Sequence, residues 1–410
     1  MGGSHAHGHD VHADTARGPR RALIAFLTAA GATTLVGLVL LWPASSPPTV
    51  EFAAEGVTFP TAEVVAINEP CPVITADPSS PPGDERATFP EGCNQVEVRV
   101  LEGDAKGART TVDVPPGVAE SGLQQGDDLK LVAIPAQDDR PATFGYFGTE
   151  RTVPIVWLTV VFVVVVAIVA RARGLLALLG LVFAGVVLAK FMLPALLLGS
   201  SGLAVALVGA SAIMFVVLYL AHGLSVRTST ALAGTLVGVA IIAVLGVYAV
   251  EAARLSGLGD GGEVLRAQAP DLNFRGLLTC AVIVAGLGIL NDVTITQSSA
   301  VWELRAAAPE MPRRQLFASG MRIGRDHIAS TIYTIVFAYA GTALSVLLLL
   351  SLYDRPALDL LTDEAIAEEV LRTLASAIGL VLAVPATTAL AAGSVAAAVP
   401  ADRPAPATAG

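Results

Sequence analysis

Polar residues that could do chemistry gather in one stretch of an otherwise apolar region, between Gly286 and Ser299. A carboxylate at membrane depth costs several kcal/mol unless it is paired or hydrated, so it usually faces a cavity or a partner. Gly286 and Gly288 could allow a helix break or a close helix crossing just before Asp292. The alternative is that Asp292 lies one turn from the membrane surface and caps a helix at Thr294. We predict a functional cluster of an acid, two amides and hydroxyls, made of Asn291, Asp292, Thr294, Gln297 and Ser298.

A second polar cluster lies between Gly320 and Ser345. Its candidate site residues are Arg325, Asp326, Thr331 and Thr334. Steps of three and four put a small, polar stripe on one face of the next predicted helix. This stripe could line a solute path with Arg325, Asp326 and His327 at its cytoplasmic mouth, or it could be a helix-packing surface. For Arg325 and Asp326 the alternative is a positive anchor beside a helix cap. The stripe consists of His327, Thr331, Thr334, Ala338, Gly341, Thr342 and Ser345.

Motifs for several classes of enzyme are missing from the sequence. It contains no glycine-rich phosphate loop with a lysine, no Gly-x-Ser-x-Gly elbow and no His-Glu-x-x-His pair. Asp292 and Asp326 could imitate an aspartyl dyad, but neither lies in a supporting motif. We therefore expect that the chain is not an enzyme.

Charge also excludes one class of partner. The net charge is −10, and residues 43–152 alone carry 18 acidic and 7 basic residues, a net of −11. The remainder is close to neutral, so there is no basic field that would attract nucleic acid.

Two further groups of residues could bind a metal or form a disulfide. Neutral imidazoles on a flexible tail can capture zinc, nickel or copper, although the tail could equally have no defined role. No other cofactor is predicted. In an oxidising compartment Cys71 and Cys93 would form a disulfide, whereas Cys280 is a small buried residue of a membrane helix. The histidines of the N-terminal tail are His5, His7, His9 and His12.

The elements that position these residues are predicted to be membrane helices. Hydrophobic residues make up 54% of the chain and charged residues 15%, and the mean hydropathy is +0.67. The apolar residues fall in blocks of about 20, the length that a helix needs to cross a bilayer core. The lipid bilayer is therefore the first predicted partner. We predict about eight spans, at residues 22–42, 153–170, 174–193, 200–221, 230–250, 276–295, 328–350 and 373–396.

Basic residues set the predicted orientation. The cluster of Arg17, Arg20 and Arg21 places the N-terminus in the cytoplasm, and we favour a retained anchor at 22–42 over a cleaved signal peptide. The predicted cytoplasmic loops hold most of the remaining arginines, and the external loops are acidic. The protein is thus predicted in the cytoplasmic (inner) membrane with both termini in the cytoplasm. A few arginines lie on the predicted external side among acidic residues, and we expect them to form a solvent-exposed rim: Arg254, Arg266, Arg275, Arg355 and Arg372.

Between the first two predicted spans the sequence changes to short stretches of alternating apolar and polar residues, separated by Pro and Gly. Such stretches predict strands at 57–67, 95–101, 110–114 and 128–134, in a small barrel or sandwich outside the cytoplasm. The fold class is thus an all-α polytopic membrane protein with a β-rich extracytoplasmic domain inserted after the first helix. The predicted organisation is a His-rich tail (1–21), an anchor (22–42), the β-rich domain (43–152), a seven-helix membrane domain (153–396) and a cytoplasmic tail (397–410).

Three sequence blocks resemble a known family. The run from Gly286 to Ser299 resembles the Gly-x-Gly-x-x-x-Asp-x₆-Ser signature of YibE/F-like membrane proteins. Gly324-Arg325-Asp326, followed by Thr331, Thr334 and Phe337–Gly341, is similar to a second block, and Ala231–Gly238 to a third. The resemblance covers residues 150–396, and the anchor with an external domain fits the YibE-like branch. Asn291 and His327 depart from the family pattern, so the resemblance implies no role for His327.

The resemblance implies a multi-pass membrane protein of the kind often considered a transporter, in a family that often occurs as paired proteins. A second membrane subunit or a homo-oligomer is therefore an expected partner. The first functional hypothesis is a secondary transporter or efflux permease, with Asp292 and Asp326 as coupling or substrate-binding groups. The second is a non-transporting scaffold or sensor that binds an envelope partner through its external domain.

Overall fold

The structure is a computed structural model, and its chain divides into two compact units. One unit contains residues 1–49 and 166–410, and the other contains residues 50–165. The predicted histidine tail, the Cys71–Cys93 pair and the tail from residue 397 lie outside the described residues. The structure describes residues 17–46, 51–68, 94–136, 141–259, 262–352 and 356–395.

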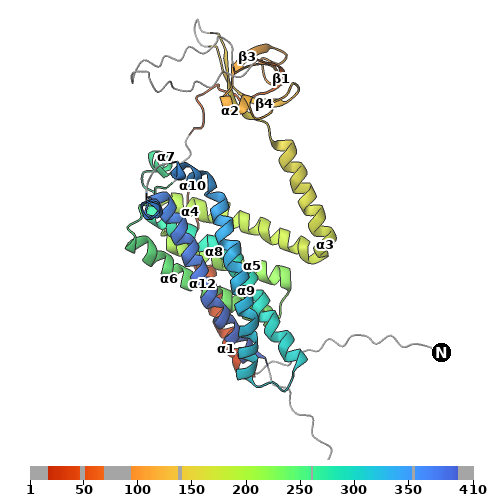
Figure 1. Cartoon of the computed structure of the whole chain (residues 1–410), viewed down its shortest axis with the longest axis vertical. Coiled ribbons are helices and arrows are strands. Elements are labelled where there is room, and N and C mark those ends of the chain that lie inside the picture. The colour runs from red at the N-terminus through yellow and green to blue at the C-terminus, as the bar shows by residue number, and fades with distance from the viewer. Residues whose placement is uncertain are drawn as a thin grey trace, which may run out of the picture. The chain divides into compact units, whose positions relative to one another are not determined.

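The larger unit is built from helices (Figure 1). At its centre α8 packs against α6, α9 and α12, and α12 packs in turn against α6 and α9. The helices are α1 (Arg17–Leu41), the C-terminal part of α3 (Thr152–Val187), the short π-helix η1 (Leu188–Met192), α4 (Leu193–Leu197), α5 (Gly202–His222), α6 (Val226–Ala252), α7 (Gly262–Gln268), α8 (Phe274–Ala307), α9 (Arg313–Thr342), α10 (Leu344–Ser351), α11 (Ala357–Leu361) and α12 (Glu364–Ser394).

The central helices begin at side chains that accept hydrogen bonds from the first turn. Thr228 N–H donates to Ser225 Oγ at the start of α6 over 3.0 Å, and Gly276 N–H donates to Asn273 Oδ1 at the start of α8 over 2.9 Å. At α12 the acceptor is Asp363, whose Oδ1 lies 3.3 Å from the Ala365 nitrogen. Such caps satisfy N–H groups that have no partner within the helix.

Six helical segments of the described chain are long and apolar enough to cross a membrane: Gly18–Leu41, Thr152–Leu197, Gly202–His222, Val226–Ala252, Phe274–Ala307 and Glu364–Ser394. The segment Thr152–Leu197 has 46 residues, about 69 Å at 1.5 Å per residue, against a bilayer core of about 30 Å. Arg171 interrupts it with φ +53° and ψ −141°. Two of the predicted spans, 153–170 and 174–193, lie on either side of this break.

The predicted span 328–350 differs from the observed helices. α9 ends at Thr342, and α10 begins only at Leu344. Neither is among the six segments of the described chain that are long and apolar enough to cross. The multi-pass character of the chain is confirmed, and the count of eight spans stays a prediction.

The anchor helix α1 packs against α5 and α6. Its Leu23 and Leu27 are buried, and a side chain on Gly37 would overlap Val208 of α5. A cleaved signal peptide would leave these neighbours uncovered. The packing supports the interpretation of α1 as a retained anchor, which stays a prediction.

Glycines allow α6 to lie close to its neighbours. A methyl group on Gly234 would lie 2.0 Å from Thr387 Oγ1 of α12, and one on Gly238 would lie 2.6 Å from Leu290 Cδ2 of α8. The Gly-x-x-x-Gly pair therefore serves helix packing, as such pairs commonly do in membranes.

We expect Gly234→Ala to lower the melting temperature of the detergent-solubilised protein, because it overpacks this contact at a cost of about 1–3 kcal/mol. Gly288→Ala is the matched control. It lies in α8 with no atom within 4 Å of an added methyl group, so only helix propensity acts, which favours alanine by about 1 kcal/mol. The two variants should shift the melting temperature in opposite directions. Equal shifts would contradict this account of the contact.

The smaller unit contains a five-stranded antiparallel sheet in the order β3-β2-β1-β4-β5. The strands are β1 (Thr61–Ile67), β2 (Gln95–Val100), β3 (Arg109–Asp113), β4 (Asp128–Ile134) and β5 (Thr143–Thr149), with the short helix α2 (Pro116–Ala119) between β3 and β4. β3 also lies against β5. The two ends of the sheet thus approach each other, and the sheet curls into a small, partly open barrel like the five-stranded barrel of OB-folds, rather than a sandwich.

Four of the five strands match the predicted ranges closely. Their inward residues form the core of the barrel, with Val64, Val98 and Leu131 almost completely buried. β5 was not predicted, because Gly145 and Gly148 interrupt the alternation of apolar and polar residues that marks a strand. In the sheet its backbone pairs with β4, which makes it the outermost strand in the order.

Candidate functional site

The predicted polar cluster lies on α8, which runs without a break from Phe274 to Ala307. Gly286 therefore marks a close helix crossing, not a break: an added methyl group would lie 2.5 Å from Ile242 Cδ1 of α6. Asp292 is near the middle of the 34-residue helix, about 27 Å from its start. The alternative in which Asp292 caps a helix starting at Thr294 does not hold, because both residues are inside α8.

Three members of the cluster face the packed side of α8 and bond to other helices. Thr294 Oγ1 lies 2.6 Å from Thr235 Oγ1 of α6, and Ser298 Oγ donates to the carbonyl of Arg227 over 2.8 Å. Thr294 and Ser298 are completely buried. These hydroxyls satisfy their hydrogen bonds within the protein, so they hold α8 against α6.

Gln297 joins three helices. Its Nε2 donates to the carbonyl oxygen of Gly320 on α9 over 2.8 Å and to Thr388 Oγ1 on α12 over 2.7 Å. Gly324 of α9 lies close above it, since an added methyl group would be 3.0 Å from Gln297 Oε1. The predicted role of Gln297 in a transport site thus competes with a role in fixing α9 and α12 on α8.

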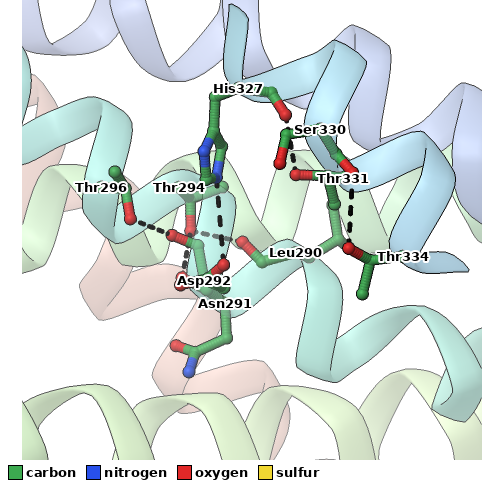
Figure 2. Close-up of polar contacts among 9 residues, drawn as sticks. All are labelled: Leu290, Asn291, Asp292, Thr294, Thr296, His327, Ser330, Thr331 and Thr334. Carbon is green, nitrogen blue, oxygen red and sulfur yellow. Dashed lines mark hydrogen bonds and ion pairs between the residues drawn. The ribbon is translucent and has the colours of Figure 1, made fainter.

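Asp292 points to the other side of α8. Its side chain is 70% exposed, and its Oδ2 lies 3.9 Å from Nε2 of His327 on α9. Figure 2 shows the imidazole reaching from α9 toward this carboxylate. The contact is an ion pair when the imidazole is protonated, and imidazole is the side chain that most readily changes charge near neutral pH.

Asn291 and Asp292 are neighbours in sequence but diverge in space. In Figure 2 the Asn291 amide points away from His327. Asn291 Oδ1 is buried and accepts no hydrogen bond from the described residues. A buried amide oxygen without a donor is costly, so this position suits a water molecule or a solute.

The predicted residues of α9 separate in the structure. Thr331 is buried and donates to the carbonyl of His327 over 2.8 Å. Thr334 is exposed and donates to the carbonyl of Ser330 over 3.3 Å. Arg325 and Asp326 are exposed, and neither makes an ion pair within the part of the chain that the structure describes. The stripe thus turns inward only at Thr331, and Ser345 lies beyond the end of α9 on α10.

Two groups of residues make contacts that were not predicted from the sequence. His327 was predicted at the mouth of a possible solute path, but its position opposite Asp292 is seen only in the structure. At the start of α12, Arg372 was assigned to a solvated rim, but it pairs with Glu369 over 2.6 Å and is only 21% exposed. The four-residue spacing of Glu364, Glu368 and Arg372 was the available signal, since it places them on one helical face.

No group of three or more His, Cys, Asp or Glu residues that could hold a metal ion occurs in the described residues. The histidine tail lies outside them, so metal binding there stays a prediction. The carboxylate and imidazole of Asp292 and His327 are instead suited to proton exchange or to binding a single cation.

Comparison with known proteins identifies the membrane unit. Residues 158–396 match the family model described as YibE/F-like protein. This range includes all of α5 to α12, and with them Asp292 and His327. No curated protein and no solved structure is significantly similar to the chain.

Proposed function

The chain belongs to the YibE/F-like family of membrane proteins, and we propose that it is a secondary transporter or efflux permease with Asp292 and His327 at its coupling site. The observation that carries the proposal is this pair, with 3.9 Å between carboxylate and imidazole, near the middle of α8. An acid at that depth is costly in lipid, which favours a functional role. No chemical reaction is part of the proposal.

The pair supplies a physical basis for coupling. When His327 is protonated, the opposite charges compensate each other, and loss of that proton leaves Asp292 with an uncompensated charge. A bound proton or cation therefore changes the free energy of holding the site open to one side of the membrane or the other. Arg325 and Asp326 are exposed nearby along α9 and are better placed to attract a solute than to couple its movement.

The surface around Asp292 supports a water-lined path. Gly288, Asp292, Thr296, Ser299 and Glu303 follow one another at steps of three or four and are exposed or partly exposed. By contrast, the exposed residues of α3 include Leu181 and Val182, each 63% exposed, as expected for a face in lipid. We propose that a second copy or a second membrane subunit covers the polar face of α8 and completes the path.

The placement of the protein follows from its charge distribution. We propose the cytoplasmic membrane, with both termini in the cytoplasm and residues 43–152 outside, because arginines favour the cytoplasmic ends of spans.

The test is thermal stability of the purified protein in detergent against divalent cations, inorganic anions, amino acids and short peptides. A ligand that binds only the folded state stabilises it by about 2.7 kcal/mol at one hundred times its Kd. We expect one class to raise the melting temperature of the wild type and of Asp326→Asn, but not of Asp292→Asn. A shift that persists in Asp292→Asn, or no shift with any class, would remove the support for the proposal.

The second candidate function is a scaffold or sensor, supported by the compact barrel unit and by the packing roles of Thr294, Gln297 and Ser298. Deletion of residues 50–145 distinguishes the two. A scaffold would lose all function without the barrel, whereas a permease would keep basal flux of its solute through the membrane unit.

A further inference from the structure

A second polar site lies at the N-terminal end of α8, beside Phe274 and Leu277. A half-open cavity of about 420 Å³ is lined by the N-terminal turns of α8 and α12, by α7 and the segment before it, and by the junction of α9 and α10. All of its lining residues belong to the larger unit. Phe274 lines this cavity and is about 27 Å from Asp292 along α8, so the two sites are separate.

Glu368 is the main polar group of the cavity. Its side chain is on the buried face of α12, with a relative exposure of only 9%. Its Oε1 is buried and has no hydrogen-bond partner among the described residues. No cationic side chain forms an ion pair with it in that part of the chain. A carboxylate in such surroundings lacks the compensation that a buried charge requires.

The charge of Arg372 supplies part of this compensation, and its Nε is a buried donor without a hydrogen-bond partner in the described region. Arg372 Nη1 donates to Glu369 Oε1 over 2.6 Å, so the guanidinium is engaged by the other acid. Glu369 Oε2 is also buried and without a partner in the described region. Two acids and one arginine therefore leave an excess negative charge and free acceptor atoms at the cavity, a combination that favours a cation and repels an anion.

The rest of the lining is apolar and includes Phe274, Leu277 and Ile366. A cavity of this volume falls in the range of sites for small organic molecules, about 300–1,000 Å³. A bare metal ion would leave most of it empty, and the described residues contain no set of three metal-binding side chains. An aromatic ring such as that of Phe274 also attracts organic cations through its face.

We propose that this cavity binds a small organic cation with an ammonium group, held by Glu368 and surrounded by Phe274, Leu277 and Ile366. The ammonium group donates hydrogen bonds to the free oxygens of Glu368 and Glu369, and the alkyl part of the ligand displaces water from the apolar wall. Binding at this site does not depend on the proposed transport function. If the chain is a transporter, the site indicates the class of its solute.

The test uses n-butylammonium, 1-butanol and butyrate as cationic, neutral and anionic probes of nearly equal shape. Binding to the full-length protein is measured by calorimetry and by the melting temperature, at constant ionic strength. Butylammonium should bind and stabilise, and the other two should not. Glu368→Gln, which keeps the shape of the side chain, should weaken butylammonium binding at least about tenfold. Glu251→Gln removes an exposed acid of α6 and should leave binding unchanged.

A second variant distinguishes the effect of the Glu368 charge from the effect of the cavity volume. Leu277→Phe adds volume to the apolar wall and keeps the Glu368 carboxylate, and it should also weaken butylammonium binding while the protein stays folded. Equal binding of butylammonium and butanol would overturn the proposal, as would unchanged binding in Glu368→Gln. So would the absence of binding together with a raised melting temperature of Glu368→Gln, which would mean that Glu368 is a neutral, purely structural carboxyl group.

Discussion

Asp292→Asn protein reconstituted in liposomes is expected to lose pH-driven accumulation of its solute by roughly two orders of magnitude, the factor that corresponds to about 2.7 kcal/mol. Asparagine keeps the size of the side chain but carries no charge, so it cannot form an ion pair with His327. The protein should still fold, because the Asp292 side chain is 70% exposed and makes no buried hydrogen bond. The measurement is initial uptake under an imposed pH gradient, with the solute class found by thermal stabilisation.

His327→Gln and Asp326→Asn are the companion variants. Glutamine can still donate a hydrogen bond to Asp292 but cannot carry the positive charge of a protonated imidazole, so uptake should no longer respond to the imposed pH gradient. Asp326 is exposed and forms no ion pair in the described part of the chain, so its variant should keep most of the wild-type rate. Wild-type uptake by Asp292→Asn, or an equal loss in Asp326→Asn, would contradict the assignment of Asp292 as the coupling group.

Gln297→Leu is expected to destabilise the membrane core clearly. The side chain is 2% exposed and donates to both Gly320 and Thr388. Hydrogen bonds between membrane helices contribute about 0.6 kcal/mol on average and up to about 1.7 kcal/mol. Loss of two such bonds, with the Gly320 carbonyl left unsatisfied, should therefore cost about 1–3 kcal/mol.

The measurement is unfolding of the purified protein by a denaturing detergent, followed by helix content. Thr296→Val is the control, because Thr296 lies on the exposed face of α8 and bonds only to the carbonyl of Asp292, four residues earlier. Its stability should change little. A stable Gln297→Leu protein would mean that α9 and α12 are held on α8 by glycine packing alone.

Local patterns explain why much of this architecture could be predicted. Long apolar runs indicate membrane helices because backbone groups in lipid must be satisfied within the segment itself. Alternating residues predicted β1 to β4, since one face of each strand packs into the barrel core. The blocks around Gly286, Gly324 and Gly234 likewise predicted the family. The family model confirms it and matches residues 158–396, which include all three blocks.

Other features depended on contacts that a local pattern does not contain. The glycines of β5 hide its alternation, and only pairing with β4 defines it as a strand. The continuity of α8 through Asp292 depends on packing against α6 and α12, which keeps a polar segment helical where a cap was also conceivable.

The sequence by itself determined that this protein is a multi-pass membrane protein of the YibE/F-like family with a small β-domain, because hydropathy and short motifs act over neighbouring residues. Only the tertiary structure decided which polar residues act together. Thr294 and Gln297 turn into the bundle, whereas Asp292 turns outward to His327, because successive residues of a helix point about 100° apart. The same holds for Glu368 and Arg372, which line a cavity together with residues of α7 and α8 that are far from them in the sequence.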